Sequence, residues 1–194
     1  MKPLTVIHVD KDMSRDAALN AWASKHFKKW NSKLTYRNVE EFIEAGWNDT
    51  DFMCRDYCAN LAEICTAEVL GAAWEPSKKA RSWDVRKDGI FHSVKSIYDP
   101  FDNKKYFPYE DNNYNYETLL HPDGGSCTSV WFWELRGVGG YEIDAYCWGM
   151  LAPEVCKSII EKVEYLKYGR KYNFQGVNIK TIKEMAHEQV YASN

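Results

Sequence analysis

The sequence has no long hydrophobic run, no Cys-x-x-Cys pair and no glycine-rich phosphate loop between a strand and a helix. A membrane-spanning helix needs about 20 mostly apolar residues in a row. Structural zinc sites use compact pairs of cysteine or histidine, and glycine-rich loops that lead into a helix hold phosphates. These absences argue against a membrane anchor, a zinc module and a nucleotide-binding loop.

Neither sign of charge is in large excess. The chain has 28 acidic and 25 basic residues, which gives a net charge of −3. We therefore expect no general electrostatic attraction to nucleic acid or to anionic membranes. The opening residues do not form an export signal, so we expect a cytoplasmic protein whose six cysteines are reduced.

What the chain does contain is a full apolar core and many aromatic residues. Its 194 residues are 45% hydrophobic, with 8 Trp and 13 Tyr. That size fits a single globular domain over residues 1–194. Hydrophobic periodicity and turn residues predict the following elements: a strand over 4–9, a helix from Ser14, a helix over 50–73, a hairpin turned at Asp88-Gly89, and helices over 153–166 and 178–191.

This order of elements predicts an α+β fold. We expect a small antiparallel sheet, with a mixed sheet as the alternative, built mainly from residues 82–148 and covered by helices from both chain ends. Its centre should be a β-hairpin over 130–148, because two aromatic-rich segments flank the turn sequence Gly137-Val138-Gly139-Gly140.

The hairpin also supplies the first candidate site. A turn centred on Val138-Gly139 would pair Trp133 with Asp144 and Trp131 with Tyr146. One face would then combine aromatic, apolar and acidic residues: Trp131, Trp133, Leu135, Glu142, Asp144, Tyr146 and Trp148. Either a helix covers such a face, or it is a binding surface for a protein or small ligand. A metal site on its two acids is a third hypothesis, for which no third ligand is visible.

Asp10 and Asp12 supply the second candidate site. They follow a short apolar strand, where active sites of open α/β sheets usually lie. The segment Val6-Ile7-His8-Val9-Asp10-Lys11-Asp12 resembles the opening motif of haloacid-dehalogenase-type phosphatases. The resemblance implies a nucleophilic Asp10, a general acid/base at Asp12 and a Mg²⁺ ion. The residues that follow, Met13-Ser14, depart from the family pattern, and the alternative is that both acids lie in a turn that begins a helix.

The sequence contains no complete catalytic set, so binding is the leading functional hypothesis. We expect a small intracellular protein that engages a protein partner or small ligand through aromatic and acidic residues. Its size and lack of motifs would suit an accessory protein of a virus or mobile element. The alternative is a Mg²⁺-dependent phosphoryl hydrolase or nuclease that uses Asp10 and Asp12.

Overall fold

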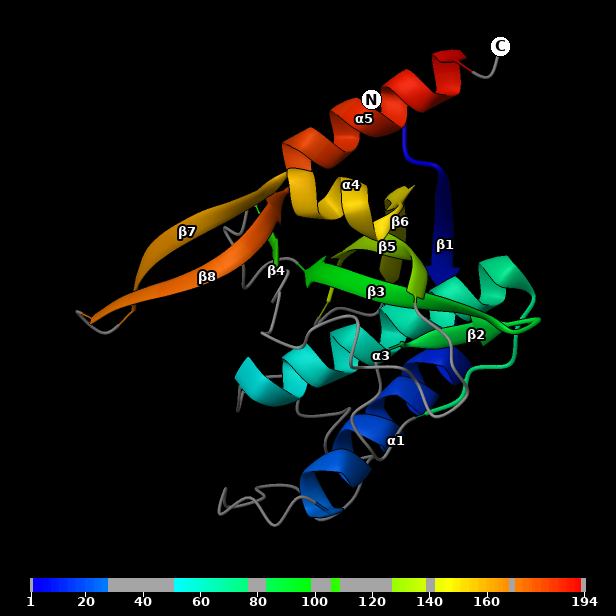
Figure 1. Ribbon diagram of the computed structural model, residues 1–194. Coiled ribbons are helices and arrows are strands. Elements are labelled where there is room, and N and C mark those ends of the chain that lie inside the picture. Colours follow the sequence, from blue (N-terminus) through cyan, green and yellow to red (C-terminus); the bar gives the residue numbers. More distant parts are fainter. Residues whose placement is uncertain are drawn as a thin grey trace.

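The computed structural model describes residues 2–27, 51–76, 83–98, 106–108, 127–138, 142–167 and 170–192. These residues form a mixed α+β fold, so the predicted class is confirmed (Figure 1). The larger sheet has the order β1-β6-β5-β3-β2, with β1 (Thr5–Val9), β6 (Ile143–Leu151), β5 (Cys127–Arg136), β3 (Ile90–Tyr98) and β2 (Val85–Lys87). β3 and β5 run parallel and the other neighbours antiparallel, so the sheet is mixed.

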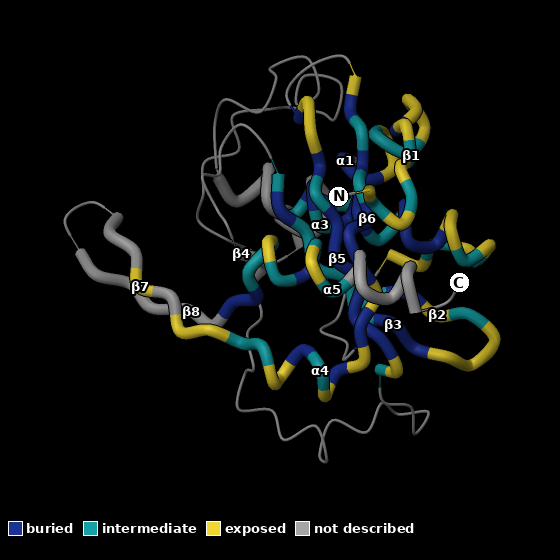
Figure 2. Tube along the Cα trace, turned by 90° about the horizontal axis from the view of Figure 1, so that it is seen from above, coloured by how far each residue is buried: buried dark blue, intermediate teal, exposed yellow. Residues whose placement is uncertain are grey.

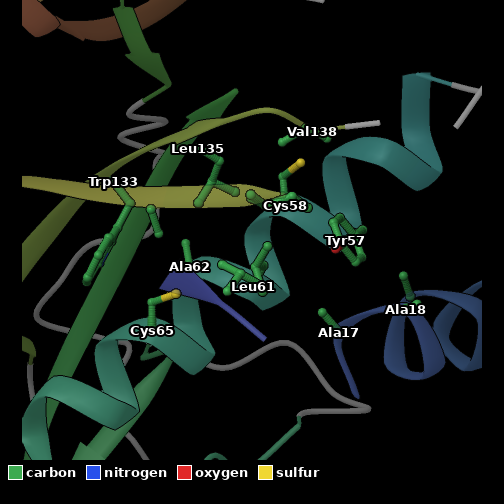
Figure 3. Packing of buried hydrophobic residues seen from close by; sticks show 14 of the residues in the cluster. Ala17, Ala18, Tyr57, Cys58, Leu61, Ala62, Cys65, Trp133, Leu135 and Val138 are labelled. Carbon is green, nitrogen blue, oxygen red and sulfur yellow. The ribbon is translucent and has the colours of Figure 1, made fainter. Parts of the chain in front are cut away.

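The helix α3 (Asp51–Leu70) covers one face of this sheet, and α1 (Lys11–Phe27) packs against α3. Apolar side chains of α3 lie between β5, with Trp133 and Leu135, and the Ala17 and Ala18 side chains of α1 (Figure 3). The buried Trp133 indole also donates a hydrogen bond of 2.8 Å from Nε1 to Thr66 Oγ1 of α3. The apolar contact area and this polar link together fix α3 against the sheet.

The opposite face is covered at one end by α4 (Pro153–Ser158) and α5 (Ile179–Ala192). α5 lies close to β6 because Gly149 has no side chain, and a Cβ there would stand 3.2 Å from Ile182 Cγ2. Phe132 of β5 is fully buried beneath these helices. None of the helices in the described part of the chain is both long and apolar enough to cross a lipid bilayer.

A second, smaller sheet has the order β4-β8-β7, with β4 (Tyr106–Pro108), β8 (Arg170–Asn178) and β7 (Ile160–Lys167). β7 and β8 form an antiparallel ribbon that extends away from the rest of the molecule in Figures 1 and 2. The helix predicted over 153–166 is confirmed only as far as Ser158, and from Ile160 onward the prediction is wrong because a strand follows. Pairing with β8 satisfies the backbone groups of this strand.

The β2–β3 turn matches the prediction. Asp88 and Gly89 both adopt positive φ, at 50° and 78°, as a two-residue hairpin turn requires. α3, by contrast, ends earlier than predicted. Gly71, at φ 60°, ends the helix, and the backbone N–H groups of Gly71 and Ala72 donate back into its last turn.

The β5–β6 hairpin is present, but its predicted register is wrong. Glu134 pairs with Tyr146 rather than Ile143, and Trp133 pairs with Cys147 rather than Asp144. The predicted turn at Val138-Gly139 is too short, since the two strands are joined by residues 137–142. From Trp133 to Arg136 the observed pairing differs from the predicted one by three residues, which exchanges the faces of one strand relative to the other.

Candidate functional site

A surface that we call the open face lies at the β1 side of the larger sheet. Two rows of paired residues cross neighbouring strands there: Val6, Tyr146 and Glu134 in one row, and His8, Asp144 and Arg136 in the other. We define the open face as Val6, His8, Arg136, Asp144 and Tyr146. It lies on the side of the sheet opposite α1 and α3, next to the part that α4 and α5 cover, and Tyr146 packs against that covered cluster.

The second row alternates in charge. His8 Nδ1 lies 2.8 Å from Asp144 Oδ1. On the other side of Asp144, Arg136 is the residue opposite it on β5. The hydrogen bond to Asp144 raises the pKa of His8 above its ordinary value, with a smaller contribution from the charge of Glu142. When the His8 imidazole is protonated, the row presents a cation, an anion and a cation on three adjacent strands.

Glu134, the β5 residue of the first row, contacts side chains of β5, β6 and α5. Its carboxylate accepts hydrogen bonds from Arg136, at 3.2 and 3.1 Å, and from Trp148 Nε1 at 2.6 Å. Lys183 of α5 adds an ion pair at 3.3 Å. Burial alone would raise the pKa of Glu134, but these hydrogen bonds and the Lys183 charge outweigh it and hold the pKa below its ordinary value.

Aromatic rings and cations alternate along the same network. The Arg136 guanidinium lies 4.4 Å from the centre of the Tyr146 ring, and Tyr146 stacks on Trp148 at 6.2 Å between centroids. Lys183 Nζ lies 4.0 Å from the centre of the Trp148 ring. These contacts restrict the side-chain conformations of Tyr146 and Arg136.

The predicted site residues of the hairpin do not lie together. Trp131 and Trp133 are buried against α1 and α3, so neither indole forms part of the open face. Asp144 and Tyr146 are half-buried on the opposite side, and Trp148 is buried beside them under Lys183. The predicted grouping of Trp131 and Trp133 with these residues is wrong, because Cys147 and not Asp144 lies opposite Trp133, and Met150 and not Tyr146 lies opposite Trp131. Glu142 is exposed just before β6.

Asp10 and Asp12 lie at the start of α1. Asp10 Oδ1 accepts a hydrogen bond of 2.8 Å from the Met13 N–H, so Asp10 is the N-cap of the helix, which begins at Lys11 and not at the predicted Ser14. Asp12 is exposed in the first helical turn, where the helix dipole favours a negative charge. Within the residues that the structure describes, no three His, Cys, Asp or Glu side chains gather to hold a metal ion.

Five of the six cysteines are free thiols, in agreement with the prediction of reduced cysteines: Cys58, Cys65, Cys127, Cys147 and Cys156. The side chain of Cys54 lies outside the described part of the structure. Burial raises the pKa of Cys65 and of Cys147 to about 12, so both remain protonated at neutral pH. A protonated thiol is a poor nucleophile and a poor metal ligand. These two cysteines therefore act as core residues.

Sequence reasoning missed four residues that shape the open face: Val6, His8, Arg136 and Lys183. The alternation within β6 was visible in the sequence, because Ile143, Ala145 and Cys147 are apolar while Asp144 is not. The alignment of β5 with β6 could not be read from the sequence, because it depends on the length of the turn and on an irregularity between Phe132 and Trp133.

Comparison with known proteins adds no family to this description: no family model, curated protein or solved structure matches the chain.

Proposed function

We propose that this chain is a binding protein that engages another protein through the open face. The observation that carries the proposal is the ordered pair of Tyr146 and Arg136 on an accessible sheet surface. Tyrosine and arginine are among the residues that most often dominate binding energy at protein interfaces. Here both are held by Glu134, Trp148 and Lys183, so binding needs little further ordering.

The charges and apolar residues of the open face favour a protein over a nucleic acid. The Asp144 carboxylate lies between His8 and Arg136, whereas a nucleic-acid interface is predominantly positive. Val6, which is 46% exposed, adds an apolar contact beside the aromatic ring of Tyr146. An apolar and aromatic centre with a charged rim is the usual composition of a protein interface.

Capture from an extract of the source cells tests this proposal with three forms of the chain as bait. They are the wild type, Tyr146→Thr in the open face, and Val69→Thr on α3 as the matched control, because Val69 is also exposed, at 42%. We expect at least one protein that the wild type and the control retain and that Tyr146→Thr loses. Equal capture by all three baits would overturn the proposal.

The alternative, a Mg²⁺-dependent phosphoryl hydrolase or nuclease centred on Asp10 and Asp12, stays a prediction. A thermal-shift series with Mg²⁺, Mn²⁺ and nucleotides separates it from protein binding, since a ligand that binds only the folded state raises its stability. Asp10→Asn is the informative variant because asparagine also caps helices well. Metal-dependent stabilisation that this variant abolishes would favour the enzyme; we expect none.

A further inference from the structure

His92 of β3 forms a buried polar cluster with two residues of β5. Its Nδ1 atom lies 2.7 Å from Ser129 Oγ and 3.4 Å from Trp131 Nε1. All three residues are buried, at 7% exposure for His92 and Ser129 and 6% for Trp131. We call them the His92 cluster. Trp131 packs in the core with α3, so the cluster lies on the side of the sheet opposite the open face and is separate from the proposed binding surface.

The indole of Trp131 determines which nitrogen of His92 carries the proton. An indole nitrogen can only donate a hydrogen bond, so His92 Nδ1 must accept it through a lone pair. The imidazole is therefore neutral, with its proton on Nε2. A second proton would have to enter at Nδ1, where it would face the indole N–H. The Ser129 hydroxyl can turn and accept from that proton, but Trp131 cannot.

The charged groups around the His92 cluster do not favour a proton on His92. Among the residues that the structure describes, the ring has no hydrogen-bond partner outside the cluster. The Asp84 carboxylate accepts instead from Val94 N–H and from Ser93 Oγ, and Ser93 lies on the opposite face of β3. Burial alone lowers the pKa of His92 below its ordinary value. The other charged or titratable groups on the neighbouring elements at this end of the sheet contribute nothing to that shift: Arg86 and Lys87 on β2, Lys95 on β3, Cys127 on β5, and Glu63, Cys65 and Glu68 on α3.

The His92 cluster lies at the irregular end of the parallel β3–β5 pairing. Phe91 pairs with Cys127 but His92 pairs with Ser129, so Thr128 is an extra residue on β5, and its hydroxyl donates to the Phe91 carbonyl at 3.2 Å. An extra residue of this kind interrupts the backbone ladder locally. In the described sheet β2 is joined to the other strands only through β3, so this pairing attaches the β2–β3 hairpin to β5. The side-chain contacts of His92 therefore reinforce the pairing where the ladder is weakest.

We propose that the His92 cluster is a pH-sensitive switch, which holds β3 against β5 while His92 is neutral and opens this end of the pairing when His92 is protonated. Protonation turns the Nδ1 acceptor into a donor, so the hydrogen bond from Trp131 is lost and a positive charge is left in a buried site. Opening returns the imidazole to water, where it keeps the proton. One proton is taken up on opening, so the opening equilibrium should rise up to tenfold for each pH unit below the ordinary pKa of 6.5, until the pH reaches the lower folded pKa.

NMR of the full chain tests the protonation state on which the switch depends. The nitrogen-15 shifts of the His92 imidazole report which ring nitrogen carries the proton, and we expect Nε2 at neutral pH. Trp131→Phe keeps an aromatic ring but removes the indole donor, so the pKa of His92 should move back toward 6.5 in this variant. A wild-type imidazole with its proton on Nδ1 would overturn the proposal, whether or not Trp131→Phe folds.

Hydrogen exchange between about pH 8 and about pH 5 measures the opening itself. After correction for the intrinsic exchange rate, amides of residues 91–94 and 129–131 should lose protection up to tenfold per pH unit below 6.5, and amides of β6 should change less. His92→Asn is the matched control, because its amide oxygen stands near the position of Nδ1 and accepts hydrogen bonds but does not titrate. We expect the protection of these amides in His92→Asn to be nearly independent of pH. A wild type without this pH dependence, or an equal dependence in His92→Asn, would contradict the switch.

Discussion

Glu134 links three elements through one carboxylate, and its ionisation connects stability to pH. Its pKa lies below the ordinary value, so the folded state favours the charged form. The stabilisation is therefore fully present above the ordinary pKa of about 4.5 and is lost as the pH falls through the lower folded pKa. We expect Glu134→Gln to cost about 1–2 kcal/mol at neutral pH, because hydrogen bonds to a charged group are lost.

Denaturant unfolding at neutral and at acidic pH measures this effect. The difference between wild type and Glu134→Gln should shrink when both are unfolded below the folded pKa of Glu134. Glu161→Gln on β7 is the control, because that carboxylate is exposed. A loss of stability in Glu134→Gln that does not change with pH would contradict the assigned ionisation.

His8 is expected to titrate above the ordinary histidine pKa of 6.5 because of its hydrogen bond to Asp144. The sign follows from the raised pKa: the interaction favours the folded state below the ordinary pKa and is lost as the pH rises through the raised value. Titration of the imidazole signals by NMR measures this. Asp144→Asn should return the His8 pKa toward its ordinary value, while buried His92 should titrate below its own ordinary value in both proteins.

At the scale of elements, the β5–β6 connection determines which residues share a face. Gly137 has a φ of 76°, and a Cβ there would collide with the Glu142 carbonyl oxygen. Gly89 has a φ of 78° but open space around the same position. We therefore expect Gly89→Ala to cost about 1 kcal/mol from backbone strain alone, and Gly137→Ala to cost clearly more. Equal changes in the two denaturation midpoints would contradict the close approach at Gly137.

The elements that sequence reasoning located are those with strong local signals. Thr5–Val9 is a short β-branched run, and Asp88-Gly89 is a preferred hairpin turn. The helix predicted over 153–166 continues only to Ser158, because pairing with β8 favours a strand from Ile160 onward although Ile160, Val163 and Leu166 have helical spacing. Pairing with the next strand decided this case, and the spacing of apolar residues within one segment does not show it.

At the scale of the whole molecule, the candidate site was predicted only in part, because its composition depends on how separate strands pair. Asp144 and Tyr146 do lie on the surface that we propose for binding, whereas Trp131 and Trp133 lie in the core. Arg136 joins Asp144 only through the observed register, and His8 only through the pairing of β1 with β6. Both alignments join strands that are distant in sequence or separated by a turn of unknown length, so no local pattern fixes them.

The central claim is that the open face binds a protein partner, and one titration tests it most directly. The partner identified by capture is titrated into wild type, Tyr146→Thr and Val69→Thr, and the dissociation constants are compared by calorimetry. Loss of an interface hot spot costs about 2 kcal/mol, so Tyr146→Thr should bind about 30-fold more weakly while Val69→Thr binds like the wild type. Equal dissociation constants for all three forms would contradict the claim.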